Sequence, residues 1–170
     1  MKAQLYKQIR LVAHPMTFVF SLFGVMLLIP NYPYTVSFFY TTLGIFFMFQ
    51  NAREQRDSYY SALLPIRKRD TVKAAVVFCV GLELFSLIIA APFAVLSARI
   101  NPNGENLAGT DANMALFGLG FLLYGLFNLV FFPSYYRTGY KVGMAFLKGS
   151  TAVFLVVACD VVLPHVPGFQ

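Results

Sequence analysis

The sequence offers few side chains that could do chemistry together. Its two histidines, His14 and His165, stand near opposite ends of the chain, and its two cysteines, Cys79 and Cys159, each lie within an apolar run. A hydrolase needs a nucleophile and a base, or metal ligands, within reach of one another. The phosphate-binding pattern G-x-x-x-x-G-K-[ST] is also absent. We therefore predict no catalytic residues, no metal site, no cofactor and no ATP hydrolysis by this chain alone.

Glu83 is the most informative polar residue because apolar residues flank it on both sides. It stands within a long apolar run, where a charged side chain in a bilayer costs about 2.5 kcal/mol or more. One interpretation places Glu83 in the path of a substrate or of a conformational change. The other has it hold helices together through a polar partner such as Asn128 or Lys148. The sequence leaves both open.

The composition argues against an ordinary soluble domain. Of 170 residues, 58% are hydrophobic and 12% are charged, whereas a soluble domain has about 25% charged residues. The apolar residues come in blocks of about twenty, the length that a helix needs to cross the hydrocarbon core of a bilayer. Because lipid cannot satisfy the polar groups of open strands or loops, we predict an all-α integral membrane protein, with a single transmembrane domain over residues 1–170.

Five transmembrane helices are predicted from the apolar blocks. They cover about 11–30, 34–50, 72–98, 114–132 and 142–163. Residues 1–12 are typical of a short amphipathic helix at the membrane interface, with Leu5, Ile9 and Val12 on one face and basic residues elsewhere. A plain charged flank of the first span is the alternative.

The basic residues fall on one side of this arrangement. With five spans, all of the 13 lysines and arginines except Arg99 lie on the side of the N-terminus. Basic residues concentrate in cytoplasmic loops, so we predict a cytoplasmic N-terminus and a C-terminus outside. The net charge of +6 then indicates contact with anionic lipids of the inner leaflet. It does not predict nucleic-acid binding, because the charge is not gathered on a soluble domain.

The segment between the second and third spans combines charges, aromatic residues and a proline. Its sequence, NAREQRDSYYSALLPIRKRDTVK over residues 51–73, places opposite charges at helical spacing. Tyr59, Tyr60 and Leu63 follow and suit a helix with an apolar side. Pro65 stops this helix, since proline disfavours helix in the residue before it. We predict a short helix with a firm end, a shape suited to docking a cytoplasmic partner.

Small residues recur at helical spacings in the third, fourth and fifth spans, where they let helix backbones approach closely in lipid. The packing residues predicted on this basis are Ser86, Ala90, Ala94, Gly118, Gly125, Gly139 and Gly143. We expect them to pack helices within one subunit, and an interface between subunits is the alternative.

Two stretches together resemble a known family. The sequence DSYYSALLPIRKRDTVKA, residues 57–74, resembles the signature of the small permease subunits of bacterial type-2 ABC exporters. In that family an acidic segment leads to a serine-leucine-proline stretch and then to basic residues, just after the second span. The sequence FFPSYYRTGYKVGMAF, residues 131–146, is similar to the family's turn between the fourth and fifth spans. The two stretches stand in the expected order.

The resemblance implies the membrane part of an exporter in the bacterial cytoplasmic membrane. Such a chain works with a second permease subunit, the same or different, and with cytoplasmic ABC ATPase subunits that bind ATP and Mg. The helix after the second span is then the element that couples the permease to the ATPase. The implied coupling residues are Glu54, Asp57, Tyr59, Tyr60, Leu63, Leu64, Pro65 and Arg67.

The predicted function is that of a permease subunit that moves an amphipathic or hydrophobic substrate outward. The chain departs from the family in one respect, because the family usually has six spans and five are predicted here. The alternative is a small membrane protein without transport activity, such as an immunity or assembly factor that binds another membrane complex.

Overall fold

Every regular element is a helix in the part of the chain that the structure, a computed structural model, describes: residues 2–29, 32–100, 113–138 and 141–162. In chain order the elements are α1 (Lys2–Lys7), the π-helical turn η1 (Gln8–Val12), α2 (Pro15–Ser21), the 3₁₀ segment η2 (Phe23–Leu28), α3 (Thr35–Glu54), α4 (Asp57–Leu63), α5 (Lys68–Ile100), α6 (Met114–Arg137) and α7 (Val142–Val162).

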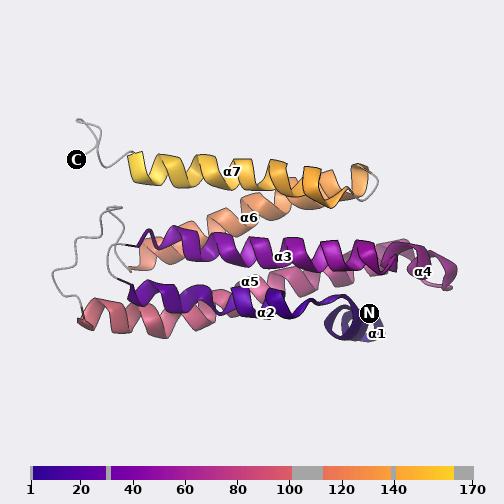
Figure 1. Cartoon of the computed structure of the whole chain (residues 1–170), viewed down its shortest axis with the longest axis horizontal. Coiled ribbons are helices and arrows are strands. Elements are labelled where there is room, and N and C mark those ends of the chain that lie inside the picture. The colour runs from indigo at the N-terminus through magenta and orange to yellow at the C-terminus, as the bar shows by residue number, and fades with distance from the viewer. Residues whose placement is uncertain (1, 30–31, 101–112, 139–140, 163–170) are drawn as a thin grey trace.

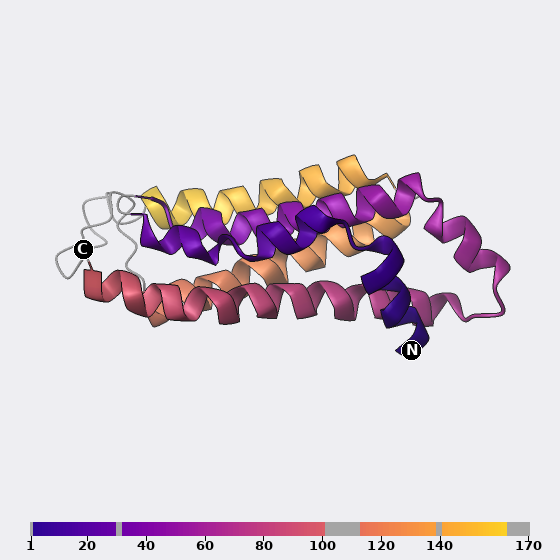
Figure 2. The ribbon, with the colours of Figure 1, turned by 60° about the horizontal axis from the view of Figure 1, so that its bottom comes forward.

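The long helices form one lengthwise bundle. Helices α3, α5, α6 and α7 run side by side, and α2 with η2 lies along α3 and α5 (Figures 1 and 2). Helices α1 and α4 lie at the same end of this bundle, and the last described turns of α5 and α7 lie at the other. The molecule is an all-α integral membrane protein, as the composition predicts.

Three of the described helices are long and apolar enough to cross a membrane: α5, α6 and residues Val142–Cys159 of α7. The count is four if the bent pair Ala3–Val12 and Pro15–Leu28 forms one span. Helix α3 has the length to cross, at 20 residues, but its hydroxyl side chains and the polar residues of its last turns lower its mean hydropathy. These hydroxyls, Thr35, Ser37, Thr41 and Thr42, are buried inside the bundle, so they do not meet lipid. The fifth crossing, by α3, stays a prediction.

The chain bends by 95° between Ala3–Val12 and Pro15–Leu28, close to the predicted division between the interfacial segment and the first span. His14 makes the corner. Its Nδ1 accepts a hydrogen bond from the backbone N–H of Met16 at 3.2 Å, and Pro15 begins α2. A side-chain cap followed by proline is a strong start signal for a helix.

The N-terminal segment turns one face toward the bundle. Gln4, Gln8 and Val12 are buried against the bundle, whereas Ile9 is exposed. Of the three residues on the predicted apolar face, Val12 lies in the core, Leu5 is half-buried against it and Ile9 is exposed, and the interfacial position of this segment stays a prediction. The polar glutamines face protein and apolar residues face outward, an arrangement that suits a segment lying against lipid.

Close approaches at small residues hold the bundle together. A Cβ added to Gly24 of η2 would lie 2.9 Å from the Cα of Ala90 on α5. A Cβ on Gly44 of α3 would lie 3.2 Å from the backbone oxygen of Thr17 on α2, and the hydroxyl of Thr17 donates to the backbone oxygen of Gly44 at 2.9 Å. Helix backbones pack this closely in membrane proteins where a small residue permits it.

The contact between Gly24 and Ala90 can be tested with a matched pair of substitutions. Gly24→Ala is expected to lower the free energy of unfolding by about 1–3 kcal/mol, because the new methyl group meets backbone. Gly81 of α5 faces open space, so Gly81→Ala is expected to be neutral or stabilising by about 0.5–1 kcal/mol. Thermal unfolding in detergent measures both, and equal midpoints would mean that η2 does not approach α5 this closely.

Candidate functional site

Helix α4 is a separate short helix set off from α3 by a sharp break. Helix α3 ends at Glu54, and Arg56 adopts the left-handed conformation with a φ of 53°. The backbone oxygen of Arg56 accepts hydrogen bonds from the N–H groups of Tyr59 and Tyr60 at 2.9 and 3.2 Å, which start α4. The predicted coupling segment is thus divided between two helices, with Glu54 on α3.

The end of α4 follows the local chemistry of proline. Helix α4 ends at Leu63, and Leu64 is extended with a ψ of 147°. A residue before proline is pushed out of the helical region by the proline ring, and Pro65 follows at once. Arg67, also a predicted coupling residue, is exposed just before α5 begins.

The outer face of α4 is apolar and exposed. Tyr59, Tyr60 and Leu63 are 61%, 62% and 66% exposed, and Leu64 is exposed beside them. No residue of α4 is buried, and α4 projects beyond the ends of its neighbours in the bundle (Figure 2). We call Tyr59, Tyr60, Leu63 and Leu64 the α4 patch.

The other face of α4 is fastened to the N-terminal helix. The ammonium of Lys7 lies 2.8 Å from Oδ1 and 3.0 Å from Oδ2 of Asp57, and it donates to the hydroxyl of Ser61 at 2.7 Å. Asp57 and Ser61 are four residues apart and share one face of α4. This face is on the opposite side of the helix from Tyr59 and Leu63. The contact of Lys7 with Asp57 and Ser61, which we call the clamp, therefore leaves the α4 patch uncovered. The sequence did not indicate Lys7 as the partner of Asp57.

A second hydrogen bond ties the same N-terminal segment to α3. The side-chain amide of Asn51 donates to the backbone oxygen of Val12, at the end of η1, at 3.0 Å. The N-terminal segment is therefore bound both to the end of α3 and to α4. The N-terminal segment therefore connects α3 and α4 across the break at Arg56.

The intramembrane polar residues come together in part. The side-chain amide of Asn128 donates to Oε2 of Glu83 at 2.7 Å, and Glu83 is 3% exposed. Oε1 of Glu83 and Oδ1 of Asn128 have no hydrogen-bond partner in the described part of the chain. Lys148 is exposed on α7 and forms no ion pair with Glu83, so of the two predicted partners only Asn128 is found. A role for Glu83 in the path of a substrate stays a prediction.

A further polar contact joins the same two helices. The hydroxyls of Ser86 on α5 and Tyr124 on α6 lie 2.7 Å apart. Ser86 was predicted for its small size, and here its hydroxyl carries the contact. Ala90 and Ala94, on the same face of α5, are buried.

Three of the predicted packing glycines, Gly118, Gly125 and Gly143, pack against no other described residue. A Cβ added to Gly118, Gly125 or Gly143 would meet nothing within 4 Å. For these three the expectation of packing inside one subunit is wrong, because α6 and α7 turn those faces outward. An interface between subunits, the alternative, stays a prediction. Gly139 lies outside the described residues.

These features define a polytopic helical membrane protein with a short helix exposed at one end. Residues 4–166 match the family model described as "ABC-2 family transporter protein". The chain therefore belongs to the ABC-2 transporter family and is a permease subunit of an ABC transporter, a class of membrane protein that associates with an ABC ATPase. Comparison with curated proteins gave no match, and neither did comparison with solved structures.

The clamp on α4 can be tested by local proteolysis. Lys7→Met removes the ion pair with Asp57, and hydrogen bonds to charged groups contribute about 1.5–3 kcal/mol. We expect α4 to open more often and trypsin to cut faster after Arg56 and Arg67. Lys73→Met is the control, because the exposed Lys73 forms no ion pair in the described part of the chain.

A charge exchange sharpens this test. The double variant Lys7→Asp with Asp57→Lys is expected to recover most of the protection that Lys7→Met loses, because it restores an ion pair of reversed direction. Equal cleavage of Lys7→Met and the unaltered chain would contradict the clamp.

The pair of Glu83 and Asn128 predicts a non-additive effect on stability. Asn128→Leu leaves a buried carboxyl without its donor, which costs about 1–3 kcal/mol, whereas replacing both partners by apolar residues can be nearly neutral. We expect Glu83→Leu with Asn128→Leu to be more stable than Asn128→Leu alone in thermal unfolding. Glu83→Gln, a neutral isostere, is expected to be tolerated. Additive losses in the double variant would show that the two side chains act independently.

Proposed function

We propose that this permease subunit belongs to an ATP-driven exporter and that the α4 patch docks on a cytoplasmic ATPase subunit. The observation that carries the proposal is the exposure of four large apolar side chains, three on the projecting helix α4 and the fourth, Leu64, directly after it. Exposed apolar patches mark sites of interaction with proteins or membranes, and we assign this one to a protein partner because the family associates with an ABC ATPase. Glu54 and Arg67 stand on either side of the patch in the sequence and are exposed, and they would supply its polar rim.

The connections of α4 support a role in transmitting force. On one side Pro65 and a short extended link lead directly into α5, the longest helix of the bundle. On the other side the clamp of Lys7 joins α4 to the N-terminal segment. ATP-driven closure of two ATPase subunits would move α4, and α5 and α1 would follow. Such coupling requires that the contacts differ between two states.

The distribution of charge supports a cytoplasmic position for this end. The basic residues on the elements that meet there are Lys7, Arg10, Arg53, Arg56, Arg67, Lys68, Arg69, Lys73, Arg137 and Lys141. Arg99 stands near the opposite end, in the last turn of α5. Positive residues favour the cytoplasmic side, so the N-terminus would lie inside and the end of α7 outside, in a bacterial cytoplasmic membrane.

The remaining parts of the transporter would come from other chains. ATP and Mg would be bound by the partner ATPase, and a second permease subunit, the same or different, would complete the membrane part. The substrate would be amphipathic or hydrophobic and would move outward. Membership of the ABC-2 family favours this function over an immunity or assembly factor without transport activity.

Docking through the α4 patch predicts a specific loss of partner binding. Tyr60→Arg and Leu63→Asp are expected to abolish co-purification with the ABC ATPase that binds the unaltered chain, while insertion into the membrane continues, because neither side chain is buried. Met114→Asp is the matched control, since Met114 is an exposed apolar residue at the other end of the bundle. Retention of the ATPase by both patch variants would refute the proposed docking site.

A further inference from the structure

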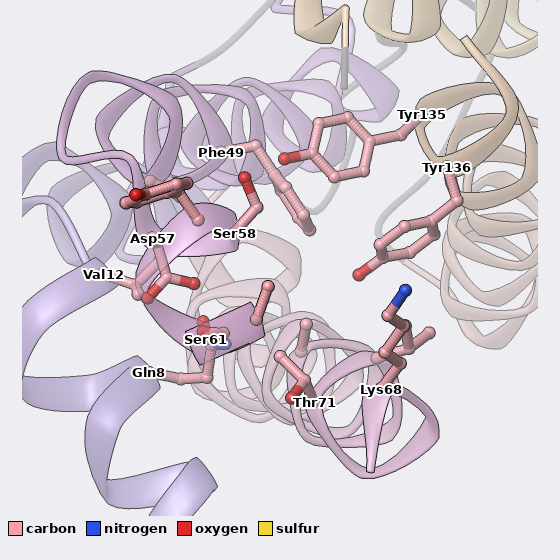
Figure 3. Close-up of a pocket in the computed structure, with 15 residues that line it drawn as sticks. Gln8, Val12, Phe49, Asp57, Ser58, Ser61, Lys68, Thr71, Tyr135 and Tyr136 are labelled. Atoms are coloured by element: carbon pink, nitrogen blue, oxygen red, sulfur yellow. The ribbon is translucent and has the colours of Figure 1, made fainter. Parts of the chain in front are cut away.

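A cavity of about 390 Å³ lies between α4 and the helices of the bundle, and Tyr59 of the α4 patch is among the residues that line it. Its walls come from the N-terminal segment, the end of α3, α4, the start of α5 and the end of α6 (Figure 3). Cavities that bind small molecules in proteins have volumes of about 300–1,000 Å³. The volume is therefore enough for a small ligand or for part of a larger one.

The cavity has a polar side with one available cation. Asp57 is the acidic residue of the lining, and Lys7 neutralises it from the side of α1. Lys68, at the start of α5, has no acidic partner in the described part of the chain. Figure 3 shows the ammonium of Lys68 and the hydroxyl of Tyr136 pointing toward one another across the cavity. Thr71 adds a hydroxyl to the same side.

The rest of the lining is apolar. Val12, Phe49, Ala52, Val72 and Ala75 form part of the wall on the side of the bundle. A cation and hydroxyls beside an apolar surface match a ligand that has an anionic head and an apolar body. A small water-soluble anion would gain nothing from the apolar part.

The place of the cavity in the fold indicates where such a ligand comes from. It lies where α5 begins and α6 ends, at the end of the bundle that carries the basic residues. If that end is cytoplasmic, as proposed above, the cavity lies at the level of the headgroups of the inner leaflet. Basic pockets between membrane helices on the cytoplasmic side are known to bind anionic headgroups.

We propose that this cavity binds the phosphate headgroup of an anionic lipid of the inner leaflet, with Lys68 as its counter-ion. Ser58, Tyr59 and Ser61 of α4 line the same cavity. A bound headgroup would therefore bridge α4 to α5 and α6, and would set the position from which α4 meets the ATPase. This consequence for coupling rests on the proposed function, but lipid binding itself is a property of the chain alone.

Native mass spectrometry of the purified full chain can test the binding. Phosphatidylglycerol is titrated against zwitterionic phosphatidylcholine of the same acyl chains. We expect phosphatidylglycerol to bind more tightly, and Lys68→Gln to weaken it about fivefold, since one lysine near an anionic surface contributes about 1 kcal/mol. Arg69→Gln is the matched control, because Arg69 is exposed on the next position and does not line the cavity.

A second pair of variants tests the place of the lipid without changing charge. Val72→Phe fills the cavity from α5 and is expected to reduce phosphatidylglycerol binding. Val77→Phe, on the exposed face of the same helix, is expected to leave the binding unchanged. Far-ultraviolet circular dichroism and thermal unfolding verify that each variant is folded.

Three outcomes would overturn the proposal. Equal affinity for both lipids would remove the need for an anionic head. Equal losses of phosphatidylglycerol affinity in Lys68→Gln and Arg69→Gln would indicate that the lipid is attracted by the general surface charge and not bound at a defined site. Displacement of the lipid by millimolar inorganic phosphate would show that the site takes the free anion and not the headgroup. None of these depends on an ATPase, so they are distinct from a failure of docking through the α4 patch.

Discussion

Lipid offers no hydrogen bonds, and this constraint explains how the bundle is arranged. Polar side chains must find partners inside, and several do so at the places where helices meet. Thr17 bonds the backbone of α3, Ser86 meets Tyr124, and Asn128 donates to Glu83. The hydroxyl-rich helix α3 is packed along α2, α5, α6 and α7, whereas the more apolar helices expose large side chains. The least apolar of the long helices is therefore the one that is most enclosed by other helices.

The same reasoning does not hold for α4, which lies outside the bundle. It buries none of its residues, and a helix this short is not stable in water by propensity alone. Its position depends on its covalent ends and on the clamp of Lys7. The half-buried ion pair is thus worth more here than an exposed pair would be. A movement of α4 that keeps the clamp must carry the N-terminal segment with it.

The sequence was informative where apolar runs have clear ends. Helices α5, α6 and α7 begin within a few residues of their predicted starts, and the stop at Pro65 follows from local geometry. The predicted division between the interfacial segment 1–12 and the first span falls beside the 95° bend near His14, but no local pattern gave the angle. Lys7 and Asp57 are fifty residues apart, and no local pattern relates them. The spacing of Gly118 and Gly125 could not show whether these glycines face the bundle or point outward, because α6 is apolar on all sides.

The two faces of α4 differ in their contacts. Its inner face has the clamp and the cavity, and it contacts the chain's own helices. Its outer face exposes tyrosines and leucines in the segment with the greatest density of charge, where Arg53, Arg67 and Arg69 keep the surroundings polar. Exposed leucines on a rigid helix give up the hydrophobic gain of burial, about 1.5–3 kcal/mol for each fully buried side chain. A partner that covered this face would recover that free energy without any rearrangement of the bundle, and this gain is the physical basis of the proposed docking at the α4 patch.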